Sequence, residues 1–209
     1  MRPQVSDKIA LVTVRSHPPT LTITLDSVVA KAGSRQMEEA MDSVRGLRWE
    51  APAGRQGLSA PLRGSVQTVL AEQIGAALGL LFPQLPSAGA ESGKGWTDTG
   101  RIDLRLDAFR ATEDAKREFR VTTSGVAGSP LELTALSELT RNGVAVMGGQ
   151  ELRMQGTGIR EASYELAPGG WPARLTSRDS LALSVTMPGN AVPVQWITRI
   201  VIEADAPPR

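Results

Sequence analysis

The chain contains no cysteine and a single histidine among its 209 residues. This excludes disulfides, thiolate metal sites and a cysteine nucleophile, and one histidine is too few for the usual histidine-based metal clusters. Aromatic residues make up only 4% of the sequence, and 23 Lys and Arg nearly balance 22 Asp and Glu, for a formal net charge of +1. So small a charge disfavours nucleic acid as a partner. We therefore expect no metal, no other cofactor and no nucleic acid.

Long apolar runs are also missing, so the sequence predicts no membrane-spanning helix. The first residues, Met1 to Lys8, lack an apolar export signal. Two interpretations stay open at this point. The protein is cytosolic, or the numbering begins after a removed export segment. The absence of cysteine fits a cell envelope, and we expect a periplasmic or membrane-peripheral location.

Catalytic motifs are absent as well. The glycine-rich run 89–95 has Gly95 where a phosphate-binding loop needs Ser or Thr after its lysine. Gly156-Thr157-Gly158 is not followed by the third glycine of a dinucleotide-binding loop. His17 stands beside two prolines, where an exposed turn residue is far more common than a catalytic base. The sequence therefore predicts a protein that is not an enzyme.

The first third of the chain mixes strands and helices. Residues 20–26 alternate strictly, with Leu21, Ile23 and Leu25 on one face, which is typical of a half-buried strand. Apolar residues at helical spacing predict a helix near 34–45. A second helix is predicted over 65–82, and its apolar stripe includes Leu70, Ile74, Leu78 and Phe82.

This second predicted helix is weakly polar on its other side as well. Such a helix is either buried on most sides or docks on a partner or a lipid surface. We favour burial, and we keep the stripe as a candidate interface or cavity lining.

Residues 83–100 read as a long loop, and the rest of the chain reads as closely spaced strands. Short spacing between strands favours antiparallel hairpins. Gly, Pro or Asn marks many of the breaks between them, and we expect turns at Asn142-Gly143, Gly148-Gly149 and Pro188-Gly189-Asn190, among others. The strands predicted along the whole chain are 9–14, 20–26, 101–107, 118–123, 131–135, 150–155, 160–166, 173–177, 181–187 and 194–203.

Arginines fall on or near these strands and alternate with acids. In the run RIDLRLD, Arg101 and Arg105 share the face of Asp103 and Asp107, which favours a solvated, mutually paired surface over a pair of catalytic carboxylates. We expect arginines to form a stripe on the open face of the sheet that suits contact with a protein. The arginines of this predicted stripe are Arg101, Arg105, Arg117, Arg120, Arg153 and Arg160.

The four tryptophans are the most informative aromatic residues. Trp49, Trp96, Trp171 and Trp196 each stand in or beside a loop or a strand start. An indole N–H needs a partner, so these positions favour half-wet sites, either an interface or the rim of a cavity. The alternative, packing at the edge of the core, is the more common fate of such residues.

These observations predict an α+β fold. We expect a single domain, 1–209, with strands and two helices in 1–82, a loop over 83–100 and an antiparallel β-meander over 101–209. The meander would be curved, as in a half-barrel or a sandwich, with both helices packed on one face.

The segment 81–86 (LFPQLP), followed by Gly95 and Trp96, resembles a segment of uncharacterised β-rich bacterial envelope proteins. In that group a helix ends in an FPxLP-like turn, and a Gly/Trp loop leads into a β-meander. The chain is more loosely similar to lipid and lipoprotein carriers of the LolA and LolB type. That resemblance implies an incomplete β-barrel with helices over an apolar cavity.

We therefore expect a non-catalytic accessory or scaffold subunit that docks on a membrane protein complex of the bacterial envelope. A photosynthetic reaction centre–light-harvesting complex, which carries extrinsic subunits without cofactors, is one such complex. The alternative is a periplasmic carrier that holds a lipid or another amphiphile between helix 65–82 and the sheet.

Overall fold

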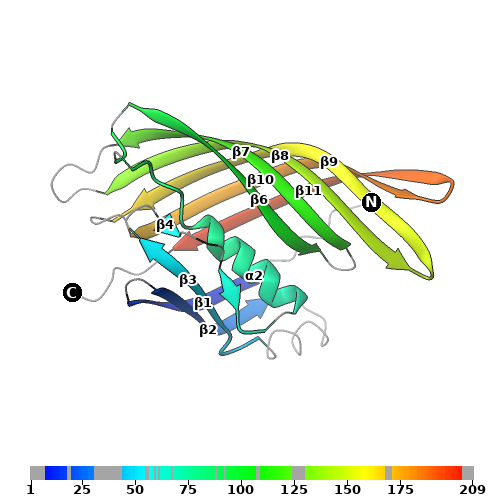
Figure 1. Ribbon diagram of the computed structural model, residues 1–209, viewed down its shortest axis with the longest axis horizontal. Coiled ribbons are helices and arrows are strands. Elements are labelled where there is room, and N and C mark those ends of the chain that lie inside the picture. Colours follow the sequence, from blue (N-terminus) through cyan, green and yellow to red (C-terminus); the bar gives the residue numbers. More distant parts are fainter. Residues whose placement is uncertain are drawn as a thin grey trace. The chain divides into compact units, whose positions relative to one another are not determined.

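The computed structural model forms two compact units, Met1–Gly79 and Leu80–Arg209 (Figure 1). Each unit contains one antiparallel sheet. The single domain predicted over 1–209 and its subdivision stay predictions. The structure describes residues 8–17, 20–30, 44–54, 57–58, 60, 62–66, 68–87, 89–91, 93–106, 109–123, 130–167 and 171–203.

The first unit is built on a hairpin. Strand β1 (Lys8–His17) pairs antiparallel with β2 (Thr20–Ala30), and β2 pairs with β3 (Arg48–Gly54). Two short strands, β4 (Gly57–Leu58) and β5 (Arg63–Gly64), both pair with β3. The alternation predicted over 20–26 is confirmed, because its three apolar residues are all fully buried: Leu21, Ile23 and Leu25.

Helix α2 (Val69–Leu80) begins after Thr68, whose Oγ1 accepts a hydrogen bond from the Ala71 N–H at 3.2 Å. A threonine in this position satisfies one of the free N–H groups of the first turn. The helix is shorter than the predicted 65–82. One reason is that the chain upstream of Thr68 continues the sheet, where the Ser65 N–H donates to the Arg48 carbonyl at 2.8 Å.

The predicted α+β class is wrong. Strands account for 73% of the structure, and the described residues contain one short helix. Residues 34–43 of the other predicted helix lie outside the described part of the chain, and 44–46 form a turn. The fold class is therefore β-rich, with two antiparallel sheets. The prediction underestimated strand because it missed 48–54, 109–117 and 136–147 and divided two long strands into shorter ones.

The second unit is a six-stranded meander in the order β11-β10-β9-β8-β7-β6, in which every neighbouring pair is antiparallel (Figure 1). This confirms the predicted β-meander. Its strands are β6 (Gly95–Leu106), β7 (Phe109–Thr123), β8 (Leu131–Met147), β9 (Gln150–Leu166), β10 (Pro172–Met187) and β11 (Asn190–Glu203).

Two of the expected turns are confirmed. Gly148 and Gly149, both with positive φ, connect β8 to β9, and Gly189, also with positive φ, lies between β10 and β11. Asn142-Gly143, by contrast, lies inside β8, and the predicted loop 83–100 ends where β6 begins at Gly95. The two strands predicted within β9, and the two within β10, are each one continuous strand.

Glycine lets β9 approach β10 unusually closely. A Cβ atom at Gly156 would collide with the Ala182 carbonyl oxygen, and one at Gly158 would collide with the Ser180 carbonyl oxygen. A side chain at either position would lie on the face of the sheet that carries the buried residues, which we call the inner face. Only glycine allows so close an approach, and such positions are where sheets coil tightly.

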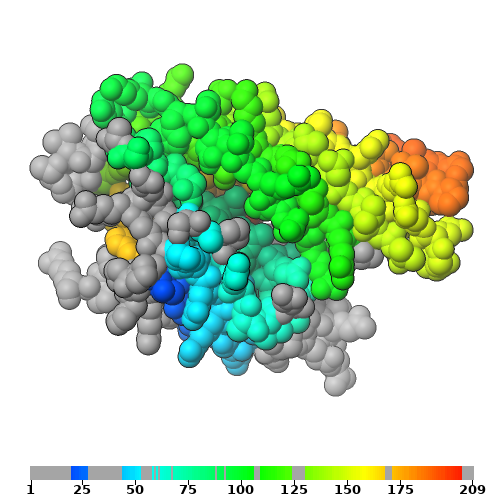
Figure 2. All heavy atoms as spheres, in the orientation of Figure 1, coloured from blue at the N-terminus to red at the C-terminus, as the bar shows by residue number. Residues whose placement is uncertain are grey.

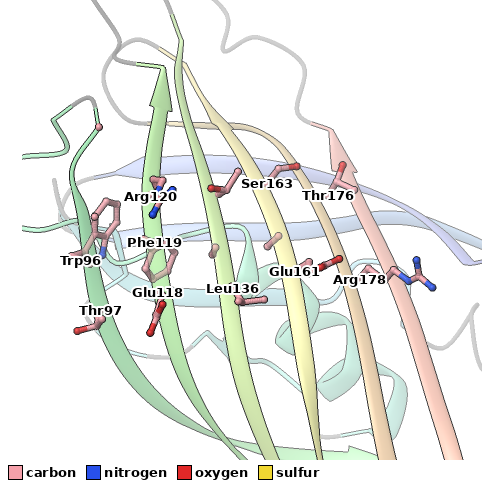
Figure 3. A pocket seen from close by; sticks show the side chains of 15 residues that line it. Trp96, Thr97, Glu118, Phe119, Arg120, Leu136, Glu161, Ser163, Thr176 and Arg178 are labelled. Atoms are coloured by element: carbon pink, nitrogen blue, oxygen red, sulfur yellow. The ribbon is translucent and has the colours of Figure 1, made fainter.

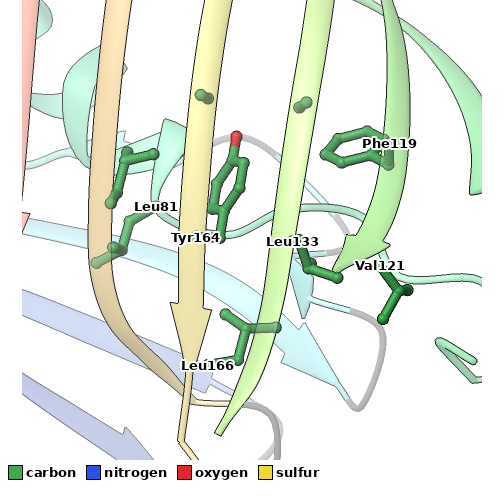
Figure 4. Close-up of a cluster of buried hydrophobic side chains, with 9 residues drawn as sticks. Leu81, Phe119, Val121, Leu133, Tyr164 and Leu166 are labelled. Carbon is green, nitrogen blue, oxygen red and sulfur yellow. The ribbon is translucent and has the colours of Figure 1, made fainter. Parts of the chain in front are cut away.

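The inner face carries two apolar clusters. One packs Leu81 against residues of β7 to β10, among them Phe119, Leu133, Tyr164 and Leu166 (Figure 4). The other lies nearer the β8–β9 and β10–β11 turns and contains Ala111, Leu139, Met154, Leu181 and Leu183. The pattern of alternating burial along β7 to β10 thus builds a core on one face, as expected for a half-covered sheet.

A helical glycine in the first unit gives a test of its packing. A Cβ atom at Gly75 would lie 2.6 Å from Nε1 of Trp49, whose side chain is only 2% exposed. Because the buried indole has little room to move, we expect Gly75→Ala to lower the free energy of unfolding by about 1–3 kcal/mol. Gly79→Ala is the matched control on the same helix, since a Cβ there meets nothing within 4 Å. It should raise stability by up to about 1 kcal/mol. Equal effects of the two substitutions in urea titrations would contradict this packing.

Candidate functional site

Four charged side chains are buried together on the inner face of the second unit. Glu113 on β7, Arg141 on β8, Arg160 on β9 and Asp179 on β10 are between 1% and 7% exposed. We call them the inner ion network. The two arginines and two acids balance in formal charge, as buried charges must if they are to be tolerated.

Arg160 is the centre of this network. Its Nε and Nη2 donate to the two carboxylate oxygens of Asp179 at 2.7 and 2.6 Å, and Nη2 also donates to Oε1 of Glu113 at 3.1 Å. Burial alone lowers the pKa of the Arg160 guanidinium, but the hydrogen bonds and charges of Asp179 and Glu113 outweigh that effect and raise its pKa. The guanidinium therefore stays charged and joins β7 to β9 and β10.

Arg141 completes the network from β8. It donates to Oε2 of Glu113 through both Nε and Nη2. Its third nitrogen, Nη1, is buried and has no hydrogen-bond partner in the described structure. The guanidinium carbon also lies 5.9 Å from the centroid of the Trp196 ring on β11, within the range of a cation–π contact.

A second ion pair extends this polar belt to the edge of the sheet. Nη2 of Arg117 on β7 lies 2.8 Å from Oδ2 of Asp98 on β6. A Cβ atom at Gly100 would collide with the Arg117 guanidinium, so glycine makes room for it. Asp98, Arg117, Ser137, Arg160, Asp179 and Thr198 are successive cross-strand neighbours in one row across all six strands.

The row through Arg117 and Arg160 lies between the two apolar clusters, while Glu113 and Arg141 lie four residues further along their strands, beside Leu139 of the second cluster. The charged side chains connect the strands to one another. Each guanidinium is fixed by carboxylates from neighbouring strands, and Oγ of Ser177 lies 3.4 Å from Asp179 Oδ1. Such charge-assisted bonds are strong and directional. The arrangement can hold register and curvature.

Sequence reasoning missed this network. It placed Arg117 and Arg160 in an outward stripe with the other arginines, whereas both belong to the inner face. The prediction is confirmed for Arg101, which is exposed and whose Nε lies 3.4 Å from Oδ1 of Asp114. Arg105 lies on the same outer face of β6. The signal available was strand parity, because Arg160 shares its parity in β9 with Ala162 and Tyr164.

The tryptophans lie in different settings. Trp49 is buried in the first unit, as the core-packing interpretation expects. Trp96 on β6 is half-buried, stacks on Phe119 at 4.9 Å between ring centroids, and donates its N–H to the Gln84 carbonyl at 3.0 Å. Trp196 is half-buried and donates to Thr198 Oγ1 at 2.7 Å. Trp171 is 36% exposed.

The apolar residues of the predicted helix stripe also differ in burial. Leu78 is buried, at 5% exposure, while Leu70 and Ile74 are half-buried. Phe82, which follows the helix, packs against the cluster around Phe119 and Tyr164. Within the second unit, Phe82 and Trp96 pack against one apolar cluster and Trp196 packs against another.

An open groove of about 880 Å³ lies over β6 to β10 (Figure 3). Glu118, Leu136, Glu161 and Arg178 are successive cross-strand neighbours in its floor. Acids, bases and hydroxyl groups are interspersed along it, and Leu136 separates the two carboxylates. Mixed chemistry of this kind is ordinary for the solvated face of a sheet.

The most distinctive exposed surface lies at the tips of two hairpins. The β8–β9 tip exposes Val144 (53%), Val146 (74%) and Met147 (55%), and the β10–β11 tip exposes Val192 (38%). In Figure 2 the two tips project at one end of the second unit, in yellow-green and orange. No charged residue occurs from 142 to 150 or from 180 to 198. We call these two turns, with their exposed apolar side chains, the hairpin tips.

The described part of the chain contains neither a candidate metal site nor a helix that could cross a membrane. No three His, Cys, Asp or Glu gather there in an arrangement that could hold a metal ion. No helix in that part of the chain has the length and apolar character needed to cross a membrane.

Comparisons with known proteins found no matching family model, no matching curated protein and no matching solved structure.

Removing the central cation should be costly. Arg160→Met leaves Glu113 and Asp179 buried without the guanidinium that bridges them, and we expect a loss of about 3–5 kcal/mol in the free energy of unfolding. The matched control is Arg153→Met on the same strand, because Arg153 forms an exposed ion pair with Glu151 at 2.7 Å. The control should change stability by less than about 1 kcal/mol. Similar losses for both variants in urea titrations would show that the inner ion network contributes no more to the free energy of unfolding than an exposed ion pair does.

Tyr164 gives a test by pH. Burial raises the pKa of its hydroxyl above the ordinary value of 10.0, although the charges of Arg160 and Arg117 offset part of that rise. The folded state therefore favours the neutral phenol, and the resulting stability is complete below pH 10 and is lost as the pH rises through the folded pKa. Tyr164 is the one tyrosine in the sequence, so tyrosinate absorbance reports it directly. The midpoint should lie above 10.0 in the folded protein and return to about that value in urea; equal midpoints would refute the assignment.

Proposed function

We propose that this chain is a non-catalytic, membrane-extrinsic subunit that docks through its hairpin tips on a membrane protein complex of the bacterial envelope and supports its assembly. A photosynthetic reaction centre–light-harvesting complex is one example of such a partner. The observation that carries the proposal is the exposure of Val144, Val146, Met147 and Val192 at two neighbouring hairpin turns, in the segments 142–150 and 180–198, each of which contains no charged residue.

The tips differ from the rest of the exposed surface. Across the strands, Leu136 and Ile159 stand opposite Glu161 and Glu138, and Val144 and Val146 likewise stand opposite Arg153 and Glu151. The tip differs in exposure, because Val146 is 74% exposed and Met147, at 55%, follows it directly, whereas Leu136 and Ile159 are 48% and 46% exposed. Single apolar residues among charges are normal on a protein surface. Clustered ones that project from a turn are costly in water, and they mark surfaces that a partner covers.

Charge favours a protein partner over a lipid bilayer. Segments that bind anionic membranes carry clusters of Lys and Arg beside their apolar residues. Here the nearest charges of the β8–β9 tip, Glu151 and Arg153, pair with each other at 2.7 Å and cancel. An apolar centre with a balanced polar rim is the usual composition of a protein–protein interface.

A periplasmic carrier of lipid or another amphiphile is the alternative function, and it rests on the resemblance to carriers of the LolA and LolB type. Native mass spectrometry of gently purified protein separates the two. A docking subunit is expected to carry no bound amphiphile, and a stoichiometric lipid would favour the carrier.

Substitution at the tips tests the proposal. In Val146→Asp/Met147→Asp, two carboxylates would have to be desolvated on docking, so co-purification of detergent-solubilised membrane proteins with the tagged chain should fall at least about tenfold. The matched control is Leu136→Asp, because Leu136 is 48% exposed on the outer face. It should leave recovery unchanged. All three side chains are exposed, so stability should change by no more than about 0.5 kcal/mol per substitution.

Two results would contradict the proposal. One is equal recovery of membrane proteins by the tip variant, the Leu136 variant and the unsubstituted chain. The other is flotation of the unsubstituted chain with protein-free vesicles of anionic phospholipid, abolished by the tip substitutions, which would assign the tips to lipid.

A further inference from the structure

The six-stranded sheet has two edges, and they are built differently. The edge strand β6 carries four charged residues, Asp98, Arg101, Asp103 and Arg105, and charges of this kind protect an edge from pairing with other strands. The opposite edge strand β11 has a single charge, Arg199, between Val192 and Ile202. No described strand pairs with the outer edge of β11. The strand therefore presents an unprotected edge rich in Ile and Val.

The burial of β11 agrees with an uncovered edge. None of its residues is buried, although the inward-facing positions of its neighbour β10 are mostly buried. On its outer face Ile197 is 58% exposed and Val201 is 46% exposed. Strands with this composition add readily to another strand, because main-chain hydrogen bonds and apolar contacts form together.

Charge indicates what kind of strand would pair here. Arg199 on β11 stands directly opposite Arg178 on β10, and like charges in this position repel. No acidic side chain in the described part of the chain forms an ion pair with Arg199. An incoming strand with an acidic residue opposite Arg199 would relieve this repulsion, and β11 itself has such a residue, Glu203, four positions further on.

We propose that β11 pairs antiparallel with β11 of a second copy of this chain, about a two-fold axis at Val201. In this register Arg199 of each copy faces Glu203 of the other, Ile200 faces Ile202, and Val201 faces itself. Glu203 contacts Arg174 of its own chain through Oε1 at 3.2 Å, so Oε2 remains for the second copy. The two copies would form one continuous sheet.

The neighbouring registers are less favourable. An axis at Arg199 would place the two Arg199 side chains against each other, and an axis at Ile200 would place Glu203 against Ile197. Registers closer to the hairpin tip would bring Pro193, which lacks an N–H, into the new pairing. Of these two-fold arrangements, the axis at Val201 is the one that joins opposite charges.

Antiparallel pairing also sets the direction of the two copies. The hairpin tips of the second copy would point away from those of the first. The dimer would therefore carry one set of hairpin tips at each of its two opposite ends. The dimer depends on β11 alone and does not require the proposed function to be correct.

Charge reversal tests the pairing. Analytical ultracentrifugation at about 1–100 µM should show the unsubstituted chain approaching twice the mass of one chain. Arg199→Glu places two acids together at both contacts, and Glu203→Arg places two arginines there, so each variant alone should dimerise at least about tenfold more weakly. A mixture of the two variants restores an Arg–Glu pair at both contacts and should recover the dimer.

The mixture separates pairing between copies from effects within one chain, such as the loss of the contact between Glu203 and Arg174. Arg153→Glu, a reversal on β9 away from the edge, is the control and should dimerise normally. A chain that stays monomeric at about 100 µM would overturn the proposal. So would equal dimerisation of the unsubstituted chain and the single reversals, or a mixture that remains as weak as its components.

Discussion

The Arg160 guanidinium bridges carboxylates from β7 and β10, and the inner face of the larger sheet is organised around that bridge. Partners for a buried guanidinium must come from fixed positions on the neighbouring strands. A slip of one residue in any of these strands would turn its charge to the outer face and leave the other charges buried without a partner. The inner ion network therefore specifies the register of four strands, which apolar packing alone specifies less strictly.

The small residues of the sheet follow from the same constraint. Gly156 and Gly158 bring the β9 backbone close to β10, and Gly100 leaves space for the Arg117 guanidinium. Large charged side chains and glycines thus lie beside one another on the inner face, where the row through Arg117 and Arg160 separates the two apolar clusters. The cost of the buried charges is offset by hydrogen bonds that connect neighbouring strands, so curvature and polar pairing depend on each other.

This belt also explains which parts of the fold were predictable. Strands whose inner positions are apolar, such as 20–26 and 101–106, follow from alternation alone, and so do the turns at Gly148-Gly149 and Gly189. Predicted breaks fell where inner positions are polar or glycine, around Gly156 to Gly158 in β9 and around Asp179 in β10. Strand was therefore undercounted and the α+β class was wrong, because a two-letter pattern of polar and apolar residues cannot show a paired charge in a core position.

The surface features were harder to predict. Trp49 was a reasonable candidate for an interface, yet it is core, since an aromatic residue beside a loop can turn inward. The uncharged stretches 142–150 and 180–198 were visible in the sequence, but their meaning depends on Val146 and Met147 lying at a projecting turn. Exposure is a property of the fold, and the composition of a segment does not reveal it.

We propose that the chain meets its partner through the hairpin tips. Site-specific photo-crosslinking in the membranes of the source organism tests this proposal, with the crosslinking side chain placed at Val146 in one variant and at the exposed outer-face position Leu136 in another. We expect discrete crosslinks to membrane proteins from position 146 and none from position 136. Crosslinks from 136 alone, or none from 146, would contradict it.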